Sequence, residues 1–366
     1  MIKKFYFIIV FIILFSNIAF AEESADSFVQ AEVIEMVQSH TEETNNQIVK
    51  LRILEGKYKG QEIYVESLYI EYSEYSFDLH KGSKVLLKLS KNEKGEIEPY
   101  IFNISREDDL KILGIIFLAA VVIFGRTRGF LSVTSLGVSG FIIIKFMIPF
   151  IQKGYNPIFI AILSSIAIIL ISFILIAGFT TKSFVAILGT VGGTVIAGLL
   201  AQIFTNICSI TGFSGEEVNY LINNLGVEID YKGLYLSGVL IGSIGVVMDV
   251  AMTITSVIFE LKKQSHNVSF SKLMNSGLQV GKDVMATMVN TLILAYIGGA
   301  MPLFLIIINY NMPFNQIMSM EIVSMEIIRS LCGSIGLILT IPLTSFIASM
   351  LVNFNKRSRM YGLKKS

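Results

Sequence analysis

Long apolar runs separated by short polar segments fill the last two thirds of the chain. From Leu110 onward, each run is long enough to cross ~30 Å of hydrocarbon as a helix. The seven runs cover about residues 110–125, 130–151, 157–178, 183–208, 234–259, 284–308 and 327–352. The pattern therefore predicts an α-helical polytopic membrane domain of seven spans over residues 110–352.

Between Ser27 and about Ser105 the apolar positions instead alternate with polar ones, which is the period of strands. Glycines mark the turns between the alternating stretches. The stretches are VQAEVIEMV, NQIVKLRIL, EIYVESLYI, SKVLLKLS and IEPYIFNIS. Five short strands of this size fit a small barrel of the OB type better than an open sheet. Residues 27–105 are therefore predicted to form a small all-β, OB-like domain.

The chain starts with the basic MIKK, continues with the apolar FYFIIVFIILFSNIAF and reaches a small-residue ending, AFA, before Glu22. This is the order of parts in a secretory signal. The apolar run is long for a signal and short for a span, so residues 1–21 are predicted to be a cleaved signal peptide or an N-terminal anchor. Both alternatives export the β-rich segment that follows.

The loop charges predict the orientation of the helices in the membrane. Lys and Arg gather at Arg126, Arg128 and Lys182 and in residues 261–283 and 353–366, whereas the loops on the other side are acidic or neutral. The basic side is expected to be the cytoplasm. We therefore expect a protein of the bacterial cytoplasmic membrane. Residues 27–105, 209–233 and 309–326 would then be extracytoplasmic, and residues 261–283 and the basic tail 353–366 cytoplasmic.

Composition agrees with an integral membrane protein, because 53% of the 366 residues are hydrophobic and 16% are charged. The lipid bilayer is therefore the first expected partner, and a net charge of +1 gives no indication of a nucleic-acid partner. Cys208 and Cys332 lack the spacing of a metal site, and GLQVGKD lacks the spacing and the Ser or Thr of a phosphate-binding loop. We expect no metal, no cofactor and no enzymatic activity.

A single carboxylate, Asp249, interrupts the apolar run from Leu234 to Phe259. A charged side chain near the bilayer centre costs about 2.5 to 3.5 kcal/mol even on lenient insertion scales. Steps of three and four residues place Asp249 on a helix face of small and polar residues, which is expected to lie against other helices or a water-filled cavity. That face contains Gly242, Gly245, Asp249, Thr253, Ser256 and Glu260.

Polar partners for Asp249 are available in the next span, where Thr287 and Asn290 lie one turn apart. Counting from the cytoplasmic ends of the two spans places Asn290 about 6 Å shallower than Asp249. A contact between Asp249 and Asn290 is therefore part of the predicted site.

The last span repeats the small-residue spacing of the Asp249 helix. Both spans contain GSIG, at 242–245 and at 333–336, and Thr340 stands where the other helix has Asp249. The repeat has two interpretations. The spans are two related helices that both contribute to a polar site, or Gly242, Gly245, Gly333 and Gly336 are glycines of two helix-packing faces.

Three stretches of the chain resemble the YibE/F family of bacterial multi-span membrane proteins. The stretches are GSIGVVMDVAMTITSVIFEL, GKDVMATMVNTLILAYIGGAMPL and EIIRSLCGSIGLILTIPLTSFIA. The resemblance covers nearly the whole chain and includes the order of an exported β-rich segment, a GRTRGF turn and the Asp-bearing helix. It implies the same architecture, and it implies no substrate and no catalytic residue.

Two functions are compatible with these patterns. In the first, the protein is a secondary transporter or permease whose polar mid-membrane site is formed by Asp249 and Asn290 with Thr253, Thr287 and Thr340, and binds a proton, a cation or a small solute. In the second, it is a membrane scaffold or assembly protein whose exported domain, residues 27–105, binds an envelope partner. The oligomeric state has no signal in the sequence.

Overall fold

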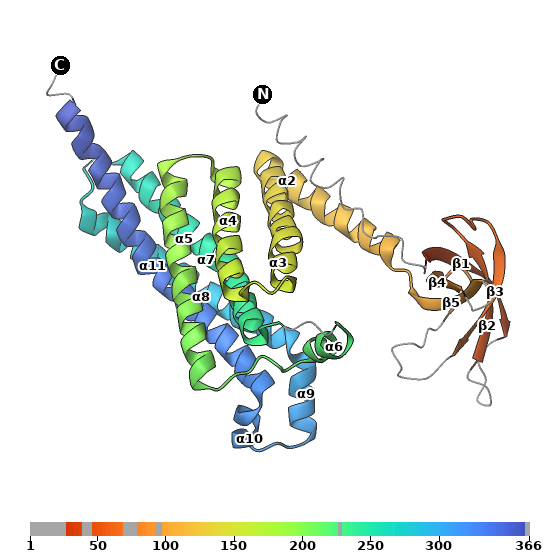
Figure 1. Cartoon of the computed structure of the whole chain (residues 1–366). Helices are drawn as coiled ribbons and strands as arrows, with labels where there is room; N and C mark the ends of the chain where they lie inside the picture. The colour runs from red at the N-terminus through yellow and green to blue at the C-terminus, as the bar shows by residue number, and fades with distance from the viewer. Residues whose placement is uncertain are drawn as a thin grey trace. The chain divides into compact units, whose positions relative to one another are not determined.

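A computed structural model describes residues 27–38, 46–68, 79–91, 97–225, 229–265 and 267–362. The chain divides into two compact units, Met1–Phe124 and Gly125–Ser366, each with its own core (Figure 1). The predicted signal or anchor segment, residues 1–21, and the end of the basic tail, residues 363–366, lie outside the described residues.

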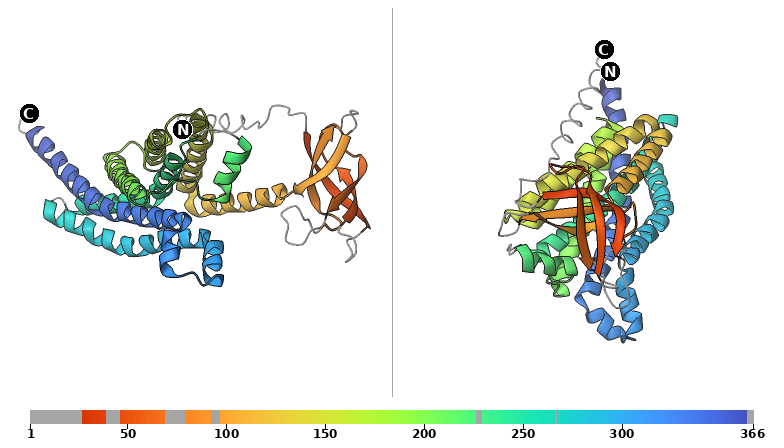
Figure 2. Two further views of the ribbon diagram at one scale, coloured as in Figure 1. Left: turned by 60° about the horizontal axis from the view of Figure 1, so that its bottom comes forward. Right: turned by 90° about the vertical axis from the view of Figure 1, so that its right-hand side faces the viewer.

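The first unit contains an antiparallel sheet of five strands (Figure 2). In space the strands follow the order β3-β2-β1-β4-β5, and β3 also approaches β5, so the sheet curls into a half-barrel. The strands are β1 (Ser27–Gln38), β2 (Asn46–Ile53), β3 (Glu62–Leu68), β4 (Lys84–Lys91) and β5 (Ile97–Ile104). This confirms the five predicted strands as a half-barrel sheet, and the OB type stays a prediction.

The alternation seen in the sequence is the alternation of the half-barrel's two faces. Val29, Ala31 and Val33 of β1 are buried with Leu51 of β2 and Leu87 of β4 in one apolar core. The residues between them point to the outer face, which therefore carries charged and aromatic side chains. One buried face and one exposed face fix the register of each strand.

The rest of the chain is helical. Its elements are α2 (Glu107–Ile142), the π-helix η1 (Ile143–Met147), α3 (Ile148–Gln152), α4 (Pro157–Ala177), α5 (Thr181–Ile207), α6 (Glu216–Leu225), α7 (Tyr231–Gln264), α8 (Phe270–Gly299), α9 (Met301–Asn309), α10 (Phe314–Ser319) and α11 (Glu321–Gly362). Within the described residues, six helices are long and apolar enough to cross a membrane, namely Glu107–Gln152, Pro157–Ala177, Thr181–Ile207, Tyr231–Gln264, Phe270–Gly299 and Glu321–Asn353. This supports the predicted multi-pass membrane architecture.

The first of these six helices contains a break at Arg126. Its backbone there is non-helical, with φ 49° and ψ −130°. An unbroken helix over Glu107–Gln152, which is 46 residues, would be about 69 Å long, more than twice the ~30 Å of hydrocarbon. The prediction of seven spans counts the parts before and after this break separately, and it stays a prediction.

The limits of the helices around residues 261–309 differ from the predicted ones. Residues 261–283 were expected to be a loop, yet α8 begins at Phe270. Its first turns have few large apolar residues because they pack through Leu273, Gly277 and Gly281, which are buried. The single run predicted over residues 284–308 is divided, since α8 ends at Gly299 and α9 starts afresh with a proline in its first turn.

Close helix approach holds the centre of the second unit together. A β-carbon at Gly193 of α5 would collide with the Thr340 hydroxyl oxygen of α11, and one at Gly336 would lie 2.6 Å from the Ala197 β-carbon. On α8, a β-carbon at Gly277 would lie 2.7 Å from Ile258 of α7. Small residues at these crossings let the backbones approach, as is common in membrane bundles.

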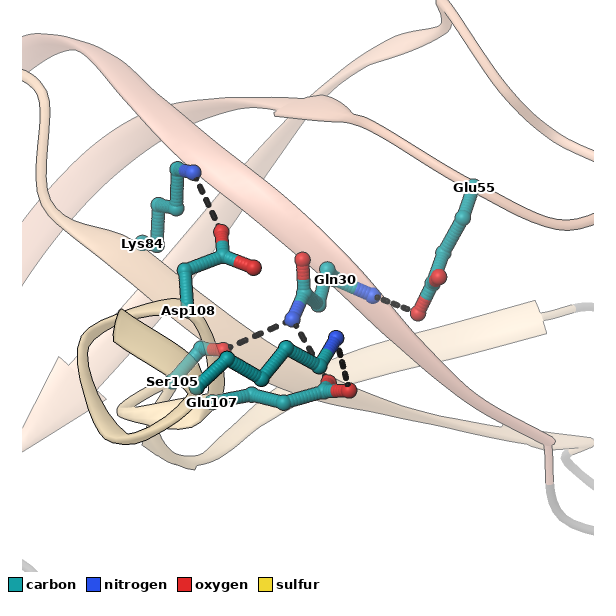
Figure 3. Close-up of polar contacts among 7 residues, drawn as sticks. Gln30, Glu55, Lys84, Ser105, Glu107 and Asp108 are labelled. Carbon is teal, nitrogen blue, oxygen red and sulfur yellow. Dashed lines mark hydrogen bonds and ion pairs between the residues drawn. The ribbon is translucent and has the colours of Figure 1, made fainter. Parts of the chain in front are cut away.

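Polar contacts tie the start of α2 to the half-barrel (Figure 3). The Gln30 side-chain amide donates to Ser105 Oγ and to Glu107 Oε2, both at 3.0 Å. Lys84 Nζ lies 2.6 Å from Asp108 Oδ2. Since only two residues separate β5 from α2, these contacts to β1 and β4 fix the direction in which the helix leaves the sheet.

Candidate functional site

Asp249 lies on the outward face of α7. The opposite face of this helix packs into the bundle through Val247, Val250 and Ile254, which are fully buried, whereas Asp249 is exposed. Its main-chain carbonyl accepts a hydrogen bond from Thr253 Oγ1 at 2.8 Å, and its side chain makes no hydrogen bond or ion pair within the described residues. The carboxylate therefore has no partner in the described part of the chain.

Asn290 and Thr287 are exposed side chains of α8. The Thr287 hydroxyl donates to the Val284 carbonyl at 3.0 Å, within its own helix. No hydrogen bond joins Asp249 to Asn290 among the described residues. The predicted direct contact is thus not present in this structure.

Two contacts between α7 and α8 show the relative height of these side chains. A β-carbon at Gly242 would lie 2.9 Å from the Tyr296 hydroxyl, and Gly277 faces Ile258. Asp249 lies seven residues after Gly242 and nine before Ile258, and the helices are antiparallel. The matching points on α8 are seven residues before Tyr296 and nine after Gly277, at positions 289 and 286. Residues 287 and 290 are therefore within about one helical turn of the level of Asp249.

Thr340 lies elsewhere in the bundle. It is fully buried between α5 and α11, next to Gly193, and its hydroxyl donates to the Gly336 carbonyl at 2.8 Å. The two GSIG segments are also used differently. A β-carbon at Gly333 would lie 3.4 Å from Leu292, whereas one at Gly245 would meet nothing within 4 Å. The structure brings the threonines at 253 and 287 to the level of Asp249 and does not bring Thr340.

A separate cavity of about 90 Å³ lies between α4, α5 and α7, and Gln202 lines it together with Ser165 and Thr194. The hydroxyl oxygens of Ser165 and Thr194 are buried and have no hydrogen-bond partner in the described structure. Asp249 and Asn290 do not line this cavity.

The sequence did not indicate a polar cluster that α7, α8 and α11 form together. The Tyr235 hydroxyl donates to the Met325 carbonyl at 2.6 Å, and the Arg329 guanidinium lies 5.5 Å from the centre of the Tyr235 ring. Glu326 lies 3.6 Å from Arg329, and it lines a cavity together with Tyr296 of α8. Arg329 stands near the start of an apolar run, which is the one signal that could have drawn attention to it.

Among the described residues, no group of three or more His, Cys, Asp or Glu side chains is arranged to hold a metal ion. The two cysteines have different environments, since Cys208 is exposed at the end of α5 and Cys332 is buried.

The fold and these helices define a class: a multi-pass helical membrane protein preceded by a small β half-barrel. Two family models match the chain, one described as "YibE/F-like protein" over residues 113–354 and one as "YibE/F family N-terminal domain" over residues 28–104. The chain therefore belongs to the YibE/F-like family, which confirms the resemblance seen in the sequence. No curated protein and no solved structure matches the chain.

Proposed function

We propose that the protein is a secondary transporter or permease, and that Asp249 binds a proton, a cation or a small solute during transport. The observation that carries the proposal is the Asp249 carboxylate, which has no partner among the described residues and is exposed on a helix whose other side is packed into the bundle. A carboxylate in a membrane-spanning helix is a functional-site hypothesis by default, because its burial in hydrocarbon is unfavourable.

The alternative role for such a residue is an interhelical hydrogen bond, which contributes ~0.6 kcal/mol on average in membranes. Asp249 makes no such bond in the described structure. Its acceptor oxygens are therefore available to a ligand or to water, which is what a transport site requires.

The neighbouring residues leave space for a ligand beside the carboxylate. Gly245 lies one turn before Asp249 on the same face, and nothing lies within 4 Å of the position its β-carbon would take. Thr253 lies one turn after Asp249, and residues 287 and 290 of α8 add polar side chains at the same level. These four positions and Asp249 form the proposed transport site.

The proposed orientation follows the loop charges. Seven spans in the bacterial cytoplasmic membrane, with residues 27–105 outside and the carboxyl terminus inside, agree with the positive-inside rule. In either orientation, Asp249 lies about midway along α7, 18 residues after Tyr231 and 15 before Gln264.

Substitution of Asp249 tests the proposal in reconstituted full-length protein assayed for proton, cation and metabolite flux. Asp249→Asn keeps the size of the side chain and its capacity for hydrogen bonding but removes the titratable charge, so we expect correct insertion and loss of flux. Asp249→Leu should also abolish flux. Gly238→Ala is a matched control, because Gly238 lies on the same exposed face with open space around it and should keep wild-type flux.

Wild-type flux in correctly inserted Asp249→Asn protein would contradict the ion-binding role. A role limited to helix packing predicts a different result, in which both variants lose at most about 1 to 2 kcal/mol of stability and activity follows the amount of folded protein.

A second candidate function is that of a scaffold whose β domain binds an envelope protein. The observation in its favour is a group of exposed aromatic side chains on the outer face of the half-barrel: Phe28, Tyr64, Tyr100 and Phe102. Phe28 and Phe102 contact each other edge to face, with ring centres 5.1 Å apart. Under this function, Tyr100→Ser with Phe102→Ser should abolish the cellular phenotype, and Asp249→Asn should leave it unchanged.

A further inference from the structure

The Arg329 guanidinium is under-partnered for its surroundings. A guanidinium carries several N–H donors and no acceptor. In the described structure, its Nε is buried without a hydrogen-bond partner, and its contact with Glu326, at 3.6 Å, is longer than a hydrogen bond. The face of the Tyr235 ring attracts the positive charge of the guanidinium, but it is a weaker hydrogen-bond acceptor than an oxygen atom. Among the described residues, Arg329 therefore has the ion pair with Glu326 but no hydrogen-bond acceptor.

A cavity of about 320 Å³ lies beside this cluster, where Glu326 and Tyr296 line it and Arg329 does not. It lies between α8, α9, α10 and α11, and Tyr296, Glu326 and Ser330 are its main polar side chains. The remaining wall is apolar and includes Ile297, Phe304 and Leu331. Its volume is within the ordinary range of ligand sites, and its lining suits a hydrocarbon chain.

The depth of Arg329 suits a lipid head group. It lies eight residues after Glu321, the first residue of α11, which corresponds to about 12 Å along the helix. Tyr235 is four residues from the start of α7, and Tyr296 is three from the end of α8. The cluster therefore lies at one end of the bundle, and the apolar cavity extends beside it.

We propose that Arg329 and this cavity form a binding site for an anionic phospholipid. The guanidinium donates hydrogen bonds to the phosphate oxygens, and one acyl chain occupies the cavity between α8 and α11. An oxyanion supplies the acceptor that Arg329 lacks, and guanidinium groups match phosphate geometry well. The proposal does not depend on the transport site, since Asp249 does not line the cavity.

Glu326 gives the site a preference among anionic lipids. Its carboxylate lines the cavity and lies near the same guanidinium, so it shares Arg329 with the phosphate and repels further negative charge. A head group with one net negative charge, such as that of phosphatidylglycerol, is therefore preferred over one with several. Removing the Glu326 charge should strengthen the binding of any anionic lipid.

Native mass spectrometry of the purified full-length protein tests the site. The protein in neutral detergent would be titrated with phosphatidylglycerol, with phosphatidylcholine of the same acyl chains, and with inorganic phosphate. In a parallel experiment, its unfolding temperature would be measured with each of these additions. The wild type should retain phosphatidylglycerol in preference to phosphatidylcholine. Arg329→Gln should weaken that binding by about tenfold or more, because a charge-assisted hydrogen bond is lost.

Two further variants separate the head-group contact from the chain contact. Ile297→Trp fills the cavity and should weaken phosphatidylglycerol binding with Arg329 intact, and Glu326→Gln should strengthen it. These variants also keep the test decisive if Arg329→Gln fails to fold. Lys153→Gln removes an exposed cation elsewhere and is the matched control, with no change expected.

Equal phosphatidylglycerol binding by the wild type, Arg329→Gln and Ile297→Trp would overturn the proposal. Stabilisation by inorganic phosphate as large as that by phosphatidylglycerol would also overturn it, because the site would then recognise a soluble anion without using the cavity.

Discussion

Gly193 of α5 and Thr340 of α11 pack so closely that a β-carbon at position 193 would overlap the Thr340 hydroxyl oxygen. The Gly336 carbonyl, which accepts the Thr340 hydrogen bond, faces the same crossing, where it would lie 3.1 Å from that β-carbon. The crossing of α5 and α11 is thus built around the absence of a side chain at residue 193.

Gly193→Ala should destabilise the bundle by about 1 to 3 kcal/mol, since the added methyl group forces the two helices apart. Thermal unfolding of the detergent-solubilised protein, followed by size-exclusion chromatography, measures the effect. Gly245→Ala is the matched control, because its β-carbon would meet nothing within 4 Å. Equal unfolding temperatures for the two variants would show that α5 and α11 do not cross as described.

The positions around Asp249 predict which substitutions share its phenotype. Asn290→Ala should reduce flux per inserted protein as Asp249→Asn does, because residue 290 lies within about one turn of the carboxylate. Thr340→Val should keep flux near the wild-type value, since Thr340 is buried in another helix crossing and its replacement is of similar shape. The reverse pattern, with Thr340→Val inactive and Asn290→Ala active, would place the path between α5 and α11.

Thiol labelling in intact cells tests the predicted orientation. In a background with Cys208 and Cys332 replaced by serine, Lys57→Cys in the β domain should react with a membrane-impermeant reagent. Ser265→Cys, at the end of α7, should react after the cells are permeabilised, because the positive-inside rule places it in the cytoplasm. Labelling at Ser265→Cys without permeabilisation, and none at Lys57→Cys, would invert the topology.

An exposed charge cluster on the half-barrel predicts a pH dependence. Lys50 Nζ lies 2.7 Å and Arg52 2.8 Å from the Glu62 carboxylate, and the hydrogen bond from Lys50, followed by that from Arg52, lowers the pKa of Glu62 below its ordinary value. A carboxyl whose pKa is lowered on folding contributes stability above its unfolded pKa. That contribution is lost as the pH falls through the lower, folded value.

Hydrogen exchange measured by mass spectrometry checks this dependence on the full-length protein. At neutral pH, the backbone amides of β2 and β3 should exchange slightly faster in Glu62→Gln than in the wild type. The difference should shrink as the pH falls below the ordinary range of a carboxyl group, because the wild-type side chain is then also neutral. The effect is small, since the pair is exposed to solvent and its charges are screened. A difference that grows at low pH would show that Glu62 acts in another way.

The sequence predicted those elements that have a local pattern of apolar and polar residues. The strands of the β domain were found because one face of each strand is buried, so that residues such as Val29, Ala31 and Val33 alternate with polar ones. The membrane helices were found because hydrocarbon imposes a length and a composition on every span. Asp249 was chosen as a candidate for the same reason, as a charge inside such a span, and its role stays a proposal.

The features that were missed depend on which helices meet. The first turns of α8 were taken for a loop because their packing uses Gly277 and Gly281 against particular residues of α7 and α11. The contact between Tyr235 and Arg329 joins residues 94 positions apart and has no local pattern. The repeated GSIG likewise gave no sign that Gly245 faces open space while Gly336 lies at a helix crossing.

Only two residues link β5 of the β domain to α2, so the linker is very short. Extended chain spans at most ~3.3 to 3.6 Å per residue, so such a link reaches about 7 Å. The bonds from Gln30 and Lys84 to the first turn of the helix restrict the movement of the β domain relative to that turn further. A domain held this way stays close to the first turn of α2. Under the proposed orientation, a binding partner in a distant layer of the envelope would have to extend to the bilayer, whereas a lipid-linked partner would already be within range.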